Sequence, residues 1–375
     1  MIDTNRPMQH LLADLKQALS ALRPGETLTF TVPDPDLCPG CYAGELFEYA
    51  DHTWRHHSWH SWSTLAHLLG CRLLTPRPAT PPYVEVRFQK LDSQASFHQA
   101  SKAHSREGTH KGSPYNPRST DNQQPSTIDH PSSTNTPPSK PEPRTPNPER
   151  NTPQTINHQP LTIHHPPSTK YRPTGIFSRI DKREEPDFLY HYLQALDEVK
   201  IEARKRILDL GVYRGDEFRV ILERLGGEEI PDMIGIDHDI DAIAYAQAHI
   251  PEATFHLHNI NGLTSLDLGR FDLLISIGTL QSPGIETKPL VMDLVQNHLT
   301  DDGAIIFGWP NSRWIDGELI QGAKAPNYPF SELSLLIKDL HWIKKYLQQH
   351  RFRVRIFGQS YLFLVATKIS KPNRV

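Results

Sequence analysis

Along residues 186–368, apolar positions recur several times at helical spacing and then at strand spacing. Pro186 opens a segment whose apolar residues fall on one helix face. Short apolar runs typical of buried strands follow at 206–210, 233–236, 253–257, 271–277 and 304–307, the last after an expected turn at 300–303. Helical patterns separate most of these runs, so the order predicts a doubly wound α/β fold with a mostly parallel sheet.

The end of the chain adds an antiparallel element to this sheet. Apolar residues on one face predict a helix from Leu333 to Leu347, and strand patterns follow at 352–357 and 361–367. Only three residues separate the two strands. Because a parallel crossover needs a dozen or more residues, we expect an antiparallel hairpin.

Residues 1–90 carry a second, shorter set of patterns. An amphipathic helix is expected over residues 8–22, and a strand, a helix and two further strands are expected at 27–32, 61–69, 71–74 and 83–88. They predict a small α/β accessory domain. The tryptophans Trp54, Trp59 and Trp62 indicate either a core anchored by aromatic residues or a recognition surface.

The segment between these two regions has a different composition. Fourteen of the 33 prolines lie within residues 101–170, which contain no Trp, Phe or Val. Such a chain cannot bury enough apolar surface to offset the entropy of ordering it. We therefore expect three parts: an accessory domain over 1–90, a disordered Pro/Ser/Thr/Asn-rich linker over 91–171, and a larger domain over 172–375.

The three cysteines are candidate ligands of a zinc site. Cys38 and Cys41 have the spacing of half a zinc site, and His57 or His60 with Cys71 could complete it. A second close pair is missing, and Cys71 lies in an apolar run where a buried thiol is ordinary. We favour a turn with packed cysteines over zinc and expect no disulfide framework, which agrees with a reducing compartment.

The balance of charged residues bears on which classes of partner the chain can bind. The chain has 40 Lys and Arg against 43 Asp and Glu, a balance that supports neither nucleic-acid nor anionic-lipid binding. No apolar stretch approaches the length needed to span a bilayer, and the chain start lacks a secretory pattern. We expect a soluble cytoplasmic protein without a membrane partner.

The first strand of the larger domain ends in an acidic and glycine-containing sequence. Asp209 and Gly211 close the strand, and Gly215 follows after a short loop. Glycine lets a backbone approach a ligand closely, and a carboxylate can receive an ammonium group. With the alternating pattern and the terminal hairpin, these residues resemble the class I S-adenosylmethionine-dependent methyltransferase family over nearly the whole of 186–368.

The resemblance implies S-adenosylmethionine as cofactor and assigns a site to it. In the family, the acid matching Asp237 takes both ribose hydroxyls, which suits a carboxylate with two acceptor oxygens. Asn259 stands where an Asp usually meets the adenine amino group. The cofactor site expected from the resemblance comprises Asp209, Gly211, Tyr213, Gly215, Asp237, His238, Asn259, Ile260 and Ser276.

Tyr213 departs from the family's usual first motif, which has a third glycine at this position. The loop resembles that of catechol-type O-methyltransferases, which hold magnesium with acids after the fourth and fifth strands. No matching acids occur here, so we expect no metal. A dinucleotide dehydrogenase needs Gly-x-Gly-x-x-Gly, and Tyr213 removes its second glycine.

The acceptor and any catalytic base are not identified by the sequence. Trp309, Asn311 and Arg313 leave the fifth strand where α/β sheets place ligands, and we expect them to line the substrate site. The alternative is that this loop packs over the sheet edge. A macromolecular acceptor is favoured, because a small metabolite needs neither accessory domain nor linker. A small-molecule O- or N-methyltransferase and an inactive methyltransferase fold serving as an interaction module are the alternatives.

Overall fold

The computed structural model describes residues 2–49, 52–92, 179–227, 229–315, 318–321 and 333–369. The expected linker lies outside the described residues from residue 93 onward. The described residues on both sides of it belong to one compact unit.

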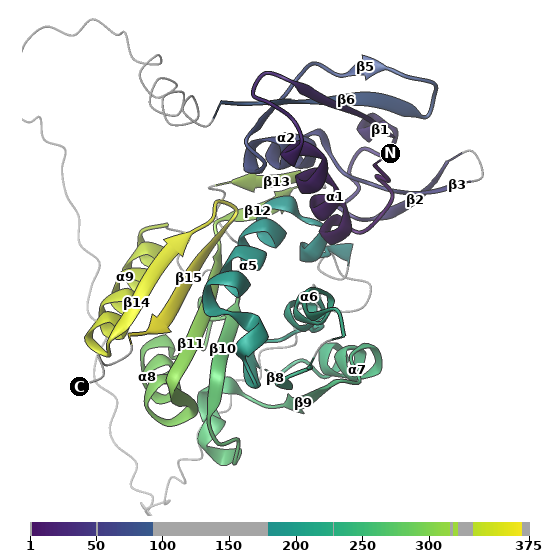
Figure 1. Ribbon diagram of the computed structural model, residues 1–375. Helices are drawn as coiled ribbons and strands as arrows, with labels where there is room; N and C mark the ends of the chain where they lie inside the picture. The colour runs from purple at the N-terminus through teal and green to yellow at the C-terminus, as the bar shows by residue number, and fades with distance from the viewer. Residues whose placement is uncertain are drawn as a thin grey trace, which may run out of the picture. The chain divides into compact units, whose positions relative to one another are not determined.

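The larger domain is built on a seven-stranded sheet (Figure 1). Five neighbouring strands are parallel, and the last two along the chain are antiparallel. The expected fold class is therefore confirmed, including the terminal hairpin. In spatial order the strands are β14 (Phe352–Phe357), β15 (Tyr361–Lys368), β11 (Leu299–Pro310), β10 (Phe271–Ile277), β7 (Arg206–Leu210), β8 (Asp232–Asp237) and β9 (Ala253–Leu257).

Helices cover both faces of this sheet. Successive side chains of each strand point to opposite faces, and apolar side chains on both faces need a covering layer. Ile207 of β7 belongs to a core cluster that includes residues of α5 (Pro186–Val199), α6 (Asp216–Leu225) and α7 (Ile240–His249). Its neighbour Leu208 belongs to a second cluster, with residues of α8 (Thr287–Asp293) and α9 (Leu333–Gln349). Asp209 follows Leu208 and so shares the face of Ile207.

The expected turn at 300–303 is wrong. Strand β11 begins at Leu299 and includes these residues, whose extra length is absorbed as an irregularity against β10. Phe271 pairs with Leu299, but Leu273 already pairs with Ala304. Polar residues with a glycine are typical of a turn and of a bulge alike, and the pattern does not separate the two.

The N-terminal residues form a small α/β module. Strands β1 (Thr27–Pro33), β6 (Tyr83–Lys90) and β4 (Cys71–Leu73) lie side by side, all antiparallel. Further elements are α1 (Met8–Ser20), η1 (Pro35–Leu37), α2 (Trp59–Leu68), the two-residue β5 (Arg77–Pro78), and a separate hairpin of β2 (Leu46–Tyr49) and β3 (His52–Arg55). The sequence patterns did not indicate that hairpin, whose side chains are largely exposed.

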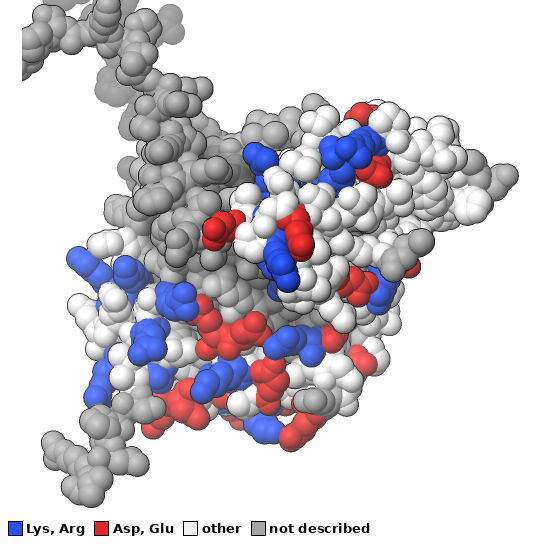
Figure 2. All heavy atoms as spheres, turned by 45° about the horizontal axis from the view of Figure 1, so that its top comes forward, with Lys and Arg blue, Asp and Glu red and all other residues white. Residues whose placement is uncertain are grey.

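Surface charges are mixed. On the face shown in Figure 2, basic and acidic side chains are interspersed, without a large area of one sign. In the described parts of the chain, no helix is long and apolar enough to cross a membrane.

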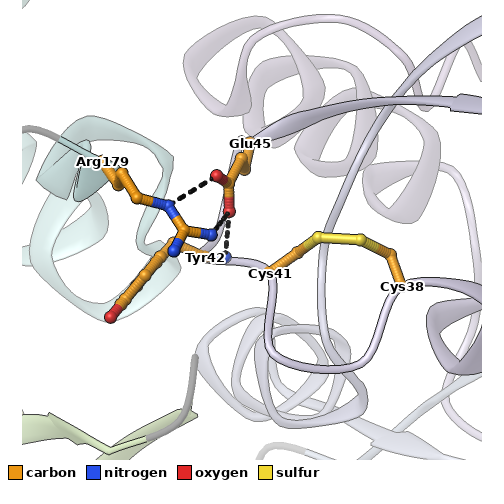
Figure 3. The surroundings of a disulfide bond; sticks show 5 residues. All are labelled: Cys38, Cys41, Tyr42, Glu45 and Arg179. Atoms are coloured by element: carbon orange, nitrogen blue, oxygen red, sulfur yellow. Dashed lines mark hydrogen bonds and ion pairs between the residues drawn. A yellow bond between two sulfur atoms is a disulfide. The ribbon is translucent and has the colours of Figure 1, made fainter. Parts of the chain in front are cut away.

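Cys38 and Cys41 form a disulfide in the loop before β2 (Figure 3). The expectation of two packed thiols is therefore wrong, since the short loop brings the two sulfur atoms together. Cys71 is a buried free thiol, as its apolar surroundings predict. No group of three or more metal-binding side chains occurs among the described residues.

Candidate functional site

The loop after β7 follows a path that its glycines permit. Gly211 and Gly215 have φ angles of 75° and 78°, in the left-handed region that glycine adopts without steric cost. The N–H groups of Gly211 and Val212 both donate to the carbonyl of Ile236, over 2.8 and 3.1 Å. The loop is therefore fastened to the end of β8. A Cβ at Gly211 would overlap the side chain of Thr279.

Tyr213 has a left-handed backbone too, with φ at 47°, although it is not glycine. Its N–H donates to Asp237 Oδ2 over 2.8 Å. This bond offers a physical reason why the chain can hold a tyrosine in a conformation that side chains rarely adopt. The departure from the family pattern is thus matched by a specific partner at the end of β8.

Asp237 is the best-connected acid of the site. Its Oδ1 accepts from the backbone N–H groups of His238 and Asp239, over 2.7 and 3.0 Å, and the side chain is 8% exposed. Burial alone would raise the pKa of this carboxyl, but hydrogen bonds from His238, Asp239 and Tyr213 hold the pKa below its ordinary value. The carboxylate is therefore ionised and fixed in orientation.

His238 and Asp239 have separate roles. The imidazole of His238 lies 3.2 Å from Asp237 Oδ1, and this contact raises the pKa of His238. Its side chain is 89% exposed, so it lies at the rim. Asp239 accepts from the first N–H groups of α7 and caps that helix, as the sequence predicts.

Asp209 is buried at the face shared with α5 and α6. The residue is fully buried, and neither carboxylate oxygen has a hydrogen-bond partner among the described residues. Burial raises the pKa of Asp209, and the neighbouring carboxylate of Glu217 raises it further. An unpartnered buried carboxylate is costly unless a cation is supplied, so this position can accept a cationic ligand group.

The remaining expected cofactor residues lie at the ends of β9 and β10. Asn259 Oδ1 accepts from the N–H of Asn261 and starts the short helix η5 (Ile260–Ser265). Ile260 is buried in the core. Ser276 is also buried, and its hydroxyl donates to the carbonyl of Leu210 over 2.9 Å. That hydrogen bond joins β10 to the end of β7.

The three residues expected to line the substrate site differ in their burial and in their contacts. Trp309 is 1% exposed and packs against Phe307, so it belongs to the core of the sheet. The side-chain amide of Asn311 donates to the carbonyl of Gln359 and thereby ties the loop to the terminal hairpin. Arg313 lies in β12 (Ser312–Ile315), which pairs with β13 (Glu318–Gln321), and its side chain lies outside the described residues.

Two residues beside Asp209 were missed by sequence reasoning. Glu217 is fully buried in the first turn of α6, where acids are ordinarily read as partners of the helix dipole. Lys182 Nζ lies 2.5 Å from Glu217 Oε1 and comes from the short helix η3 (Lys182–Glu184), before α5. Nothing in the sequence around Lys182 distinguishes it from a surface lysine.

Comparisons with known proteins agree with this fold. Residues 201–347 match the model of a family described as a methyltransferase domain. No curated protein matches the sequence.

Several solved methyltransferase structures are similar to part of the chain. One is the plantazolicin methyltransferase BpumL in complex with a monoazolic desmethylPZN analog and SAH, with 15% identity, covering 50% of this chain and 87% of that one, at a TM-score of 0.37. A ribosomal protein L11 methylase from Lactobacillus delbrueckii has 14% identity, with 48% and 79% covered and a TM-score of 0.32. A TehB-like SAM-dependent methyltransferase from Corynebacterium glutamicum has 20% identity, with 48% and 87% covered and a TM-score of 0.32.

The family match covers the five parallel strands, the glycine loop, Asp209 and Asp237, and it ends before the terminal hairpin. Together with the order of the seven strands, this match assigns the fold of this half of the molecule. The C-terminal half of the chain has the fold of a class I S-adenosylmethionine-dependent methyltransferase, and residues 201–347 within it match a methyltransferase domain.

Proposed function

We propose that the protein transfers the methyl group of S-adenosylmethionine to a macromolecular acceptor, which the N-terminal module helps to recognise. The observation that carries the first part is the carboxylate of Asp209. It is fully buried and has no hydrogen-bond partner among the described residues, at the end of the strand that leads into the glycine loop. A ligand ammonium group would supply the missing partner.

The residues around this carboxylate fit the rest of the cofactor. Asp237 is ionised and fixed by backbone N–H groups, and its oxygens have further lone pairs for the two ribose hydroxyls. Gly211 permits the left-handed turn that carries the loop past the end of β8. We assign Asn259, after β9, to the adenine amino group, because its Oδ1 is an acceptor with a second lone pair beside the one used by the N–H of Asn261.

Methyl transfer from a sulfonium requires mainly that the protein positions the two reactants. When bound, the cofactor supplies a methyl group on a positively charged sulfur. The loop from Gly211 to Gly215 and Asp237 orient that group toward the acceptor, whose lone pair forms the new bond while the carbon–sulfur bond breaks. A base is needed only where the acceptor must also lose a proton, and we assign none.

The N-terminal module supports the choice of a macromolecular acceptor. It contains an open pocket of about 520 Å³, lined by Tyr49, Arg77 and Tyr83 together with several prolines. An open groove with the exposed Tyr49 and the half-buried Tyr83 beside prolines suits an extended chain better than a small polar metabolite. A cytoplasmic location remains part of the proposal, although cytosolic reductants act against the Cys38–Cys41 bond.

Transfer of a labelled methyl group tests the proposal. The full chain is incubated with methyl-labelled S-adenosylmethionine and a cell extract, which is then separated into macromolecules and small molecules. Label in the macromolecules supports the proposal, and label in small molecules alone overturns the choice of acceptor. Cofactor binding without any transfer would favour an interaction module. The variant Asp209→Asn should lose transfer, whereas Asp241→Asn, at an exposed position of α7, should retain it.

A further inference from the structure

A short charged segment, Arg179 to Glu185, connects the N-terminal module to the cofactor site. On the module's side, the Arg179 guanidinium makes two hydrogen bonds to the Glu45 carboxylate, over 2.8 and 2.9 Å (Figure 3). Glu184 accepts from Arg55 over 2.9 Å and from the N–H of Met8 over 3.0 Å. The first helical residue of α1 is therefore fastened to this segment.

On its other side the same segment contacts α6. Lys182 Nζ lies 2.5 Å from Glu217 Oε1, and the two side chains are 17% and 1% exposed. Arg183 lies 3.6 Å from Asp216 and 3.9 Å from Glu223. Arg183 also makes two hydrogen bonds to Asp181 within the segment, over 3.0 and 2.6 Å. Two neighbouring cations thus lie near the acids of α6, while Arg179 and Glu184 contact the module.

Several titratable side chains interact electrostatically with Asp209. They are Glu217 and Asp216 of α6, Asp237 of β8, Tyr192 of α5 and Lys182 of η3. All except the tyrosine and the lysine are acids. Tyr361 of β15 also lies near Lys182 and Glu217. Lys182 is therefore the cation among the groups that act most strongly on Asp209.

The buried carboxylates of Asp209 and Glu217 affect each other's protonation. Two carboxylates that share a buried site cannot both ionise easily, and one of them retains a proton. Glu217 raises the pKa of Asp209, and Lys182 lowers it. Although burial acts against its charge, Glu217 and Asp216 raise the pKa of Lys182, so the lysine remains protonated.

We propose that Lys182 is a positioning residue of the cofactor site: its ammonium group pairs with Glu217 and neutralises it, which makes it easier for Asp209 to ionise when the ammonium group of S-adenosylmethionine binds beside it. The module contributes by holding the segment through Glu45, Arg55 and the start of α1. This inference rests on the proposed function, because it assumes that the cofactor binds beside Asp209.

The test is calorimetric titration of the full chain with S-adenosylmethionine between pH 6 and 8.5. Lys182→Met should weaken binding at pH 6 at least tenfold, because the unpaired Glu217 carboxylate then opposes the ionisation of Asp209. Taking the ratio of the two dissociation constants cancels the titration of the ligand's own amino group. Lys182→Arg should restore binding, and Lys205→Met, which removes an exposed ion pair to Glu229, should leave it unchanged.

A second variant keeps the proposal testable should Lys182→Met fold poorly. Glu217→Gln removes the carboxylate that competes with Asp209, so binding at pH 6 should be as strong as in wild type or stronger. Lys182→Met binding as tightly as wild type at pH 6, or Glu217→Gln binding more weakly than wild type, would overturn the role of Lys182. Failure of the wild type to bind at any pH would instead refute the proposed function.

Discussion

The N–H of Tyr213 and Oδ2 of Asp237 are joined by a 2.8 Å hydrogen bond that connects the glycine loop to the end of the neighbouring strand. The same carboxylate accepts from His238 and Asp239 through its other oxygen. One side chain therefore sets the position of the loop and of the chain that leads into α7. It does so from the place where the cofactor's ribose is expected.

Asp237→Asn should weaken cofactor binding about tenfold to a hundredfold, because hydrogen bonds to a charged group contribute about 1.5–3 kcal/mol. The amide nitrogen of asparagine would also face backbone N–H donors. Calorimetry with S-adenosylhomocysteine measures the change. Asp241→Asn, on the exposed side of α7, is the matched control and should bind as wild type does.

Gly211→Ala should destabilise the fold more than a left-handed backbone alone explains. Its Cβ would collide with Thr279, so the cost of the φ angle and the cost of the overlap add up, to roughly 2–4 kcal/mol. Thermal unfolding measures the change.

The matched control for this substitution is Gly226→Ala. Gly226 has φ at 60° but nothing within 4 Å of a Cβ, so its substitution should cost only about 1 kcal/mol. Equal losses of stability in the two variants would show that the contact with Thr279 is unimportant.

Stability should fall as the pH rises from 5 to 8, through Glu184. Burial raises the pKa of this carboxyl to about 7, against 4.5 for an exposed glutamate, although Arg55 opposes the shift. Between these values the folded chain holds a proton that the unfolded chain has lost, so folding weakens with pH, by about 3 kcal/mol at most. Denaturant unfolding at several pH values measures this slope.

Glu184→Gln should reduce that dependence by the share that Glu184 contributes, since the amide does not titrate. The exposed Glu229→Gln, whose side chain is 80% exposed, should leave the slope unchanged. A slope in Glu184→Gln as steep as in wild type would assign the pH dependence to other groups.

The thiols should react in a definite order. Cys38 and Cys41 are joined, and burial raises the pKa of the Cys71 thiol, which makes it a poor nucleophile. The folded, unreduced protein should therefore show little fast reaction with a maleimide, two reactive thiols after a dithiol reductant, and a third after denaturation. Two fast thiols without reductant would show that the disulfide is not formed.

The sequence was most informative where a local pattern determines a local structure. Asp239 caps α7 as expected, and the three-residue separation correctly predicts the hairpin of β14 and β15. The turn at 300–303 was wrong because a bulge and a turn use the same residues. The β2–β3 hairpin has too few buried positions to show an alternation.

The site could be predicted only in part. Asp209 and Asp237 end strands, so the order of strands brings them to one edge of the sheet. Lys182 and Glu217 meet through packing between η3 and α6, 35 positions apart, and no spacing rule connects them. The burial of Trp309 likewise depends on its neighbours in the folded sheet.

The most direct test of the account is calorimetric titration of the full chain with S-adenosylmethionine and S-adenosylhomocysteine, beside Asp209→Asn and Asp241→Asn. We expect micromolar binding of both ligands by the wild type, its loss in Asp209→Asn, and its retention in Asp241→Asn. A folded wild-type chain that binds neither ligand, or an Asp209→Asn variant that binds as tightly as the wild type, would contradict it.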